Sequence, residues 1–262
     1  MSAPVFLAER STTSPLAGVV AGAVYLLDGA EGRHAGVVQR RGPGERIDVV
    51  DGAGVRLETV VESVSGAEVH LRVERVVTEP EPPVLLTLVQ ALAKGDRDEM
   101  AIEAATEVGV DVVVPWQAER SVVVWRGERA AKSQARWVST VRAATKQARR
   151  ARMPVVEAAL TTKALVTRTT AVVEAGGTVV VLHEDATTPL ASVPLPVPTE
   201  GGPARELLVV VGPEGGIGEG ELAALTGAGA VAARLGPHVL RTSTAGPIAI
   251  ALLSERLGRW AL

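Results

Sequence analysis

The sequence predicts an α/β protein made of a small β domain and a larger domain with a parallel sheet. Three observations indicate this class. Residues 1–77 hold short runs of alternating apolar and polar residues, separated by glycine and acidic turns. Residues 78–83, TEPEPP, contain three prolines, which disfavour helix and cannot donate to a strand ladder. Beyond them, apolar strand-like runs alternate with helical patterns, as in βαβ units.

Composition and charge narrow the classes of protein further. The chain has 262 residues, and 47% of them are hydrophobic, which is enough for a sizeable core. The formal charge is −3, so any positive surface for nucleic acid must be local. Cysteine is absent and the four histidines lack metal-ligand spacing, so we expect no disulfide and no metal. No run is long and apolar enough for a membrane helix, and we expect a cytoplasmic protein.

We expect domains at residues 1–77 and 84–262, joined by a stiff linker at residues 78–83. Closely spaced strand signals predict that the first domain is a small antiparallel barrel, with a hairpin turn at Asp51-Gly52. The expected strands are residues 23–27, 35–40, 46–50, 55–64 and 68–77. RNA-binding and purely structural barrels share this pattern. Arg33 is a candidate for phosphate contact, although solvated surface arginines are common.

A βαβ pattern opens the second domain. The expected strands are residues 84–89 and 110–114. A helix is expected between these two strands. Asp96 and Glu99 have the spacing of a capping box at its start, and it ends at Gly109. Lys94 and Arg97 follow the carboxyl end of the first strand, where a substrate can approach. Ordinary surface charge at a helix start is the alternative explanation.

A block of positive charge follows. Residues 120–152 contain ten lysines and arginines and a single acid, Glu128. On a helical wheel of residues 128–151 the basic side chains lie opposite an apolar side formed around Trp137 and Val141. Solvated helix faces normally mix charge signs, so the block favours contact with RNA phosphates, which supply affinity rather than base identity. The candidates are Arg120, Arg129, Lys132, Arg136, Arg142, Lys146 and Arg149.

Two glycine-containing loops are the strongest signal of a site. Residues 207–211 predict a strand buried on both faces that breaks at Gly212, and residues 231–235 repeat the pattern before Gly236. Parallel strands place such loops at one edge of the sheet, where open α/β sheets bind small ligands. The glycine spacing fits neither a Walker motif nor G-x-G-x-x-G, which excludes those two kinds of nucleotide site.

The remaining elements of the second domain are weaker signals. We expect a short helix at about residues 161–167, a strand at 178–182 and a last helix at about 246–258. His183 follows the strand at 178–182 and is equally a structural and a functional candidate. Arg241 to Thr244 are cap-type residues that open the last helix. The prolines of residues 189–203 indicate a surface loop.

Five motifs in chain order carry a resemblance to a known family. They are QALAKGDRDEMAIEAATEVGV from Gln90, PWQAERSVV from Pro115, LHE from Leu182, GPEGG from Gly212 and LGPHVLRTSTA from Leu235. They resemble the RsmE family of SPOUT-class methyltransferases, which use S-adenosylmethionine to methylate N3 of a uridine in 16S ribosomal RNA. The chain departs from the family pattern at Lys146 and Ala148, so the roles of the family's residues there do not carry over.

The resemblance implies a fold, partners and a cofactor site. Residues 1–77 would form a PUA-like RNA-binding β-barrel, and residues 84–262 a SPOUT α/β knot in which the C-terminal segment forms a trefoil knot. The protein would act as a homodimer on 16S ribosomal RNA or on the assembled small subunit. Residues expected to bind S-adenosylmethionine are Leu182, His183, Glu184, Gly212, Pro213, Glu214, Gly215, Gly216, Leu235, Gly236, Val239, Leu240, Arg241 and Thr242.

Methylation at N3 suggests roles for two of these residues. The uridine N3 loses a proton between two carbonyl groups, and we expect Arg241 to stabilise the charge that develops on their oxygens. Glu214 either accepts the proton or binds the cofactor. Two alternatives remain open. One is another SPOUT specificity, such as ribose 2′-O or transfer-RNA guanine methylation, and the other is a non-catalytic protein of ribosomal RNA binding or assembly.

Overall fold

The computed structural model describes residues 3–8 and 16–261, which form two compact units. The first unit contains Met1–Glu81 and Thr145–Met153, and the second contains Pro82–Ala144 and Pro154–Leu262. The chain therefore returns to the first unit for a short segment in its middle. The sequence patterns did not indicate this return.

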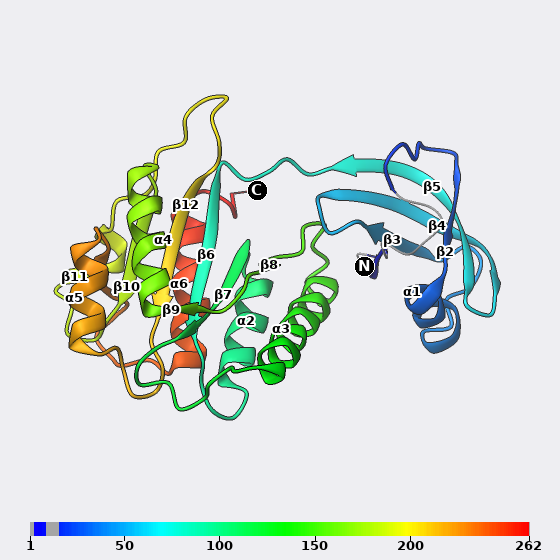
Figure 1. The fold of residues 1–262 in the computed structure, drawn as a ribbon. Coiled ribbons are helices and arrows are strands. Elements are labelled where there is room, and N and C mark those ends of the chain that lie inside the picture. Colours follow the sequence, from blue (N-terminus) through cyan, green and yellow to red (C-terminus); the bar gives the residue numbers. More distant parts are fainter. Residues whose placement is uncertain (1–2, 9–15, 262) are drawn as a thin grey trace. The chain divides into compact units, whose positions relative to one another are not determined.

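A five-stranded sheet in the order β1-β3-β4-β5-β2 forms the first unit (Figure 1). Its strands are β1 (Val5–Leu7), β2 (Val24–Leu27), β3 (Arg46–Val50), β4 (Val55–Ser65) and β5 (Glu68–Thr78). The expected antiparallel pairing is confirmed for β3–β4, β4–β5 and β2–β5, whereas β1 pairs parallel with β3. Alternating apolar residues of the strands, such as Ile47, Leu57 and Leu71, bury a common core.

Two departures from the expected strands occur in this unit. The expected strand at residues 35–40 is wrong, because the chain there continues from helix α1 (Gly29–Arg33) into the π-helical turn η1 (His34–Val38). Gly32 and Gly36 lie one helical turn apart, and a Cβ at either would overlap the carbonyl of Ala67 or Gly66. Close approach to the β4–β5 hairpin therefore selects helix over strand. Strand β1 was missed because three residues are too few for a periodic signal.

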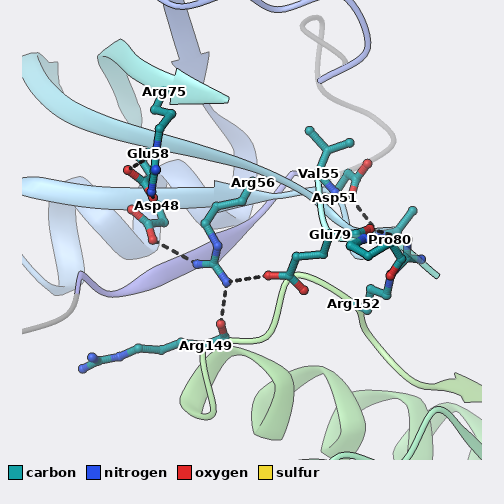
Figure 2. A network of polar contacts seen from close by, with 11 residues as sticks. Asp48, Asp51, Val55, Arg56, Glu58, Arg75, Glu79, Pro80, Arg149 and Arg152 are labelled. Carbon is teal, nitrogen blue, oxygen red and sulfur yellow. Dashed lines mark hydrogen bonds and ion pairs between the residues drawn. The ribbon is translucent and has the colours of Figure 1, made fainter. Parts of the chain in front are cut away.

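Arginines hold the segment Thr145–Met153 within the first unit (Figure 2). Arg56 donates from Nη1 to Oδ2 of Asp48 at 2.9 Å and from Nη2 to the carbonyl oxygen of Arg149 at 2.7 Å. Arg152 donates from Nη2 to the carbonyl oxygen of Glu79 at 2.7 Å. Burial raises the pKa of Asp48 even though Arg56 opposes this effect.

A parallel sheet in the order β11-β13-β10-β12-β6-β7-β8 forms the second unit, and β9 also pairs with β7. The strands are β6 (Val84–Ala91), β7 (Val112–Gln117), β8 (Val155–Val156), β9 (Leu160–Thr161), β10 (Thr178–Leu182), β11 (Thr188–Pro189), β12 (Arg205–Val211) and β13 (Val231–Arg234). The expected parallel α/β sheet is therefore confirmed.

Helices cover both faces of this sheet (Figure 1). They are α2 (Arg97–Glu107), α3 (Glu128–Gln147), whose last residues belong to the first unit, α4 (Thr162–Glu174), α5 (Glu219–Gly227) and α6 (Thr242–Arg256), with the short turn η2 (Leu190–Ser192). Leu165 and Val172 of α4 and Leu225 of α5 pack on one face, while α2 and α6 pack together on the other. Helix α6 begins earlier than expected, at Thr242, and continues through Pro247.

Candidate active site

A cavity of about 460 Å³ lies at the carboxyl ends of β10, β12 and β13. Because β10 lies between β12 and β13 and pairs parallel with both, the loops that follow the three strands meet at one edge of the sheet. All residues expected to bind the cofactor line this cavity except Gly215. Lining residues that the sequence patterns did not single out are Val211, Ile217, Arg234, Pro237, His238 and Ala245.

The loop after β12 requires glycine at two positions. A Cβ on Gly212 would lie 2.6 Å from Cγ1 of Ile217, so a side chain here would force Ile217 or the loop to shift. Gly216 has a φ of 74°, which favours glycine, and its N–H donates to the carbonyl of Pro213 at 2.9 Å. Gly215 lies outside the cavity lining, and Arg120 Nη1 donates to its carbonyl at 3.1 Å.

A threonine joins two of the three loops that line the cavity, those after β12 and β13. The hydroxyl of Thr242, the first residue of α6, donates to the carbonyl of Gly212 at 2.7 Å. The same oxygen accepts a hydrogen bond from Nε2 of Gln90 at 2.8 Å. In the sequence, Gln90 stands out only as the first residue of a motif. Its burial at the carboxyl end of strand β6 could not be predicted from the pattern.

Arg241 precedes α6 in an extended conformation, with φ −65° and ψ 152°. Its carbonyl accepts the N–H groups of Thr244 and Ala245, which fixes its backbone at the start of the helix. The side chain lines the cavity, is exposed, and has no ion-pair partner among the residues that the structure describes. Its cationic group is therefore available to a ligand.

Glu214 is fixed between two neighbouring loops. Its Oε1 accepts from Nη1 of Arg97 at 2.8 Å and from the N–H of Lys94 at 3.1 Å. Partial burial tends to raise the pKa of Glu214, but its own N–H, Arg97 and Lys94 outweigh this effect and hold the pKa below its usual value. A carboxylate stabilised in this way is a weak proton acceptor.

Glu221 supports the same glycine loop from the side of α5. Its buried carboxylate accepts from the N–H of Gly218, from the N–H of Glu119 and from the hydroxyl of Thr162. The distances are 3.2, 2.9 and 2.6 Å. One side chain thus ties together the starts of α4 and α5 and the backbone beside Arg120.

His183 lies at the end of β10 and lines the cavity. Its Nδ1 accepts a hydrogen bond of 3.3 Å from the N–H of Asp185, so the ring is oriented by the turn that follows. Glu184 lines the cavity from the same turn and is exposed.

The basic candidates in the second unit differ in their surroundings. Arg129 and Lys132 are exposed on α3 and form no ion pair within residues 3–8 and 16–261. Arg136 is paired, because Asp96 lies 2.9 Å from Nη2 and Glu99 lies 2.7 Å from Nε. The expected capping box is therefore wrong: Asp96 makes no side-chain cap, since its φ is 60° and its carboxylate binds Arg136.

The remaining candidates divide in the same way. Nζ of Lys146 lies 2.7 Å from Oε2 of Glu31, which is 5% exposed, so this ammonium group is committed within the first unit. Arg33 and Arg149 are exposed in that unit. Arg142 of the second unit is also engaged in an interaction.

Neither a metal group nor a membrane helix is present in the described parts of the chain. No cluster of three or more histidine, aspartate or glutamate side chains there is arranged to hold a metal ion. No helix there is both long enough and apolar enough to cross a bilayer.

The sequence is similar to known RNA methyltransferases. A family model described as RNA methyltransferase domain matches residues 80–254. Ribosomal RNA small subunit methyltransferase E of Mycobacterium bovis is 47% identical over 91% of this chain and 89% of that protein. The protein of the same name from Bacillus subtilis is 30% identical over 88% of this chain and 89% of its own length.

A solved structure shows the same architecture. The crystal structure of a ribosomal RNA small subunit methyltransferase E from Neisseria gonorrhoeae bound to S-adenosyl methionine has a TM-score of 0.81 and 26% identity. The match covers 97% of this chain and 98% of that one. Fold, cavity and similarity together define the class, an RNA methyltransferase with an α/β fold of the SPOUT type. Within this class, the chain belongs to the ribosomal RNA small subunit methyltransferase E (RsmE) family.

Proposed function

We propose that the protein transfers the methyl group of S-adenosylmethionine to N3 of a uridine in 16S ribosomal RNA. The observation that carries this proposal is the cavity at the ends of β10, β12 and β13, in a chain of the RsmE family. A volume of about 460 Å³ falls within the range of roughly 300–1,000 Å³ that is typical of small-ligand sites.

The residues present fit this cofactor. The cavity is lined by three loops, and at Gly212 the backbone approaches without a side chain because Ile217 occupies the space of a Cβ. Main-chain groups of residues 182–184, 212–214, 216 and 235–242 would hold the adenosine and amino-acid parts, as glycine-rich loops do in other nucleotide sites. When bound, S-adenosylmethionine supplies an electrophilic methyl group.

Arg241 and Glu214 would have different roles in the transfer. The exposed guanidinium of Arg241 would stabilise negative charge on the uridine carbonyl oxygens as N3 loses its proton. Of the two roles left open for Glu214, its lowered pKa and its bond to Arg97 favour orientation of the cofactor loop over acceptance of the proton.

RNA affinity would come from both units. We assign residues 1–77 to a PUA-like RNA-binding barrel, residues 78–83 to a linker and residues 84–262 to the methyltransferase domain. Arg129 and Lys132 are exposed and form no ion pair with any residue that the structure describes, which supports phosphate contact by α3, whereas paired Arg136 supports it less. A substrate that is 16S ribosomal RNA or the assembled small subunit would be consistent with a cytoplasmic protein, which is the location that we propose.

A trefoil knot is the finer fold that we propose for the second unit. The connection from β10 to β12 passes beyond β13, because β11 pairs with the outer edge of β13. After β13 the chain returns to α6, which packs on β6 and β12. Arg256 of α6 donates to the carbonyls of Leu190 and Val193 in that connection. These contacts support a C-terminal segment threaded through the loop.

Exposed apolar side chains of the second unit support a homodimer. Ile248 and Leu252 are exposed one turn apart on α6, and Met100 is exposed on α2, which packs against α6. Light scattering of an Ile248→Glu, Leu252→Glu variant would report a monomer if this surface forms the dimer. Val197→Glu, at a valine that is more exposed and lies in a loop, is the control and would leave the mass unchanged.

Mapping of the modified nucleoside tests the function. Cells that lack the protein would lose one N3-methyluridine from 16S ribosomal RNA, as detected by mass spectrometry of nuclease fragments. The purified protein would restore it with S-adenosylmethionine, on naked RNA or on small subunits. A ribose-methylated product, or no product together with no cofactor binding in calorimetry, would contradict the proposal.

A further inference from the structure

A fully buried glutamine lies behind the cavity. Gln90 is 0% exposed and is the next-to-last residue of β6, in register with Val211 of β12 on one side and Pro115 of β7 on the other. Its side chain reaches the point where the loop after β12 meets the start of α6. It does not line the cavity itself, so it would act on a ligand only through other residues.

The hydrogen-bond directions around Gln90 follow from the chemistry of its partners. The carbonyl of Gly212 can only accept, so the single proton of the Thr242 hydroxyl is donated there, at 2.7 Å. The Thr242 oxygen must therefore accept from Gln90, which presents its amide nitrogen at 2.8 Å. This orientation leaves the amide oxygen, Oε1, buried without a hydrogen-bond donor in the described chain.

An unsatisfied buried oxygen is unfavourable for stability. An apolar side chain of the same length would fill this space without it. The amide instead fixes the position of its neighbours. The hydrogen bonds from Gln90 to Thr242 and on to Gly212 connect strand β6 to two of the lining loops, those after β12 and β13. A Cβ on Gly246 would lie 3.3 Å from the same Oε1, so α6 also packs closely over this amide.

We propose that Gln90 is a positioning residue for the cofactor cavity: it anchors Thr242 and, through it, the carbonyl of Gly212, and so sets the distance between the two loops. This inference rests on the proposed function, because the loops matter through the S-adenosylmethionine that they would hold. Loss of the anchor is expected to lower cofactor affinity about five- to tenfold, the effect of one hydrogen bond between neutral groups. The KM for the cofactor would rise while kcat changes less.

The Gln90→Met variant tests the proposal, because methionine has a similar length and no amide. The matched control is Gln117→Met. Gln117 ends the neighbouring strand β7, and its amide holds the backbone of Val123 and Trp125, which do not line the cavity. Calorimetry with S-adenosylmethionine should show weaker binding only for Gln90→Met, and the melting temperature of that variant should be equal to or above that of the wild type.

Variants of Thr242 test the connection itself. Thr242→Ser keeps the hydroxyl and should bind the cofactor nearly as the wild type does, whereas Thr242→Val should bind weakly. Adding Gln90→Met to Thr242→Val should cause little further loss, because both act through one set of bonds. Fully additive losses would show that Gln90 acts elsewhere and would overturn the proposal.

A measurement without cofactor separates this inference from the proposed function. Hydrogen exchange of the ligand-free protein should be faster in residues 213–217 and 241–246 of Gln90→Met, and unchanged there in Gln117→Met. Failure of the wild type to bind S-adenosylmethionine would defeat the proposed function, while the exchange result would still decide the role of Gln90. The inference would be overturned if Gln90→Met had the hydrogen exchange and the cofactor affinity of the wild type. It would also be overturned if Gln90→Met and Gln117→Met weakened cofactor binding equally.

Discussion

The guanidinium of Arg97 lies 2.8 Å from Oε1 of Glu214, and this ion pair joins the start of α2 to the glycine loop after β12. Both side chains are partly exposed, so the pair contributes modestly to stability. Its main effect is local, because it keeps the carboxylate ionised and the loop in place beside the cavity. The pair therefore predicts a pH dependence of its own.

Glu214→Gln should lower the free energy of unfolding by about 0.5–1 kcal/mol at neutral pH. Because the folded protein holds the pKa of Glu214 below its ordinary value of about 4.3, this contribution is complete above that pH. It is lost as the pH falls through the lower folded pKa. Urea unfolding between about pH 7 and pH 3 should show that the difference in free energy of unfolding between the wild type and Glu214→Gln becomes smaller as the pH falls. Glu200→Gln, at an exposed loop carboxylate, is the control, and an advantage that grows in acid would contradict the assignment.

Arg241→Ala should lower kcat about 100-fold with saturating cofactor, because one preorganised cationic donor to a developing oxyanion is removed. Arg241→Lys should retain part of the rate, since it keeps the charge but loses the planar fork. Single-turnover methylation of 16S ribosomal RNA measures the rate, and calorimetry separates it from cofactor affinity. A full rate in Arg241→Ala would exclude the proposed role.

Gly212→Ala should destabilise the second unit by about 1–3 kcal/mol and weaken cofactor binding, because the new methyl group would overlap Ile217. Gly220→Ala is the matched control. Gly220 lies in α5 with open space around its Cβ position, so alanine should stabilise the protein by about 0.5 kcal/mol. Thermal unfolding with and without S-adenosylmethionine distinguishes the two variants. Equal behaviour would mean that the loop adapts to a side chain.

Lys146→Met and Lys132→Met should have opposite consequences. Lys146 neutralises the buried carboxylate of Glu31, so its loss should destabilise the first unit by about 3 kcal/mol. Lys132 is exposed without an ion pair in the described residues, so its loss should spare stability and reduce the salt dependence of RNA binding by about one charge. Urea unfolding and filter binding at several salt concentrations measure both. A lower salt slope for folded Lys146→Met would show that this ammonium reaches RNA after all.

Arg149→Gly should preserve or raise stability by about 0.5–1 kcal/mol, because Arg149 has a φ of 56°, which glycine adopts without steric cost. The carbonyl that Arg56 binds is part of the backbone and survives the change. RNA affinity should fall nonetheless if the exposed guanidinium contacts phosphate. Arg149→Ala loses the same charge but keeps the steric cost of a side chain at a positive φ. Both variants should therefore bind RNA with the same affinity and differ in melting temperature. Unchanged RNA affinity in both would remove Arg149 from the interface.

The cavity could be located from the sequence because its signal is local. The apolar run before Gly212 predicts a buried parallel strand, and a Cβ at Gly212 would indeed overlap Ile217. Parallel strands place the loops that contain Gly212 and Gly236 at one edge of the sheet, but the position of β10 between β12 and β13 could not be read from the sequence. The wall residues Pro237 and His238 lie inside the quoted motif but carry no chemical signal of their own. Their place depends on how the loop folds back, which periodicity does not report.

Other features could not be predicted because they depend on contacts between residues that are distant in sequence. Lys146 matched the basic face of a helix, yet its partner Glu31 comes from the first unit's own helix, more than a hundred positions away. Asp96 had the spacing of a helix cap, yet its charge is used by Arg136. Residues 35–40 alternated like a strand, yet Gly32 and Gly36 let the chain pack as a helix. In each case a tertiary contact outweighed a local preference.

The register of β6 with β12 begins with Val84 beside Arg205, so the centre of the second sheet joins parts of the chain that are synthesised far apart. Strand pairs with such long sequence separation form late in folding, because a large loop must close first. A partly folded chain that has only β6, α2 and β7 therefore has no cavity to offer. A small ligand that contacts all three lining loops binds and stabilises only the fully folded protein. Its presence would therefore stabilise the product of the last folding step and would not affect the early steps.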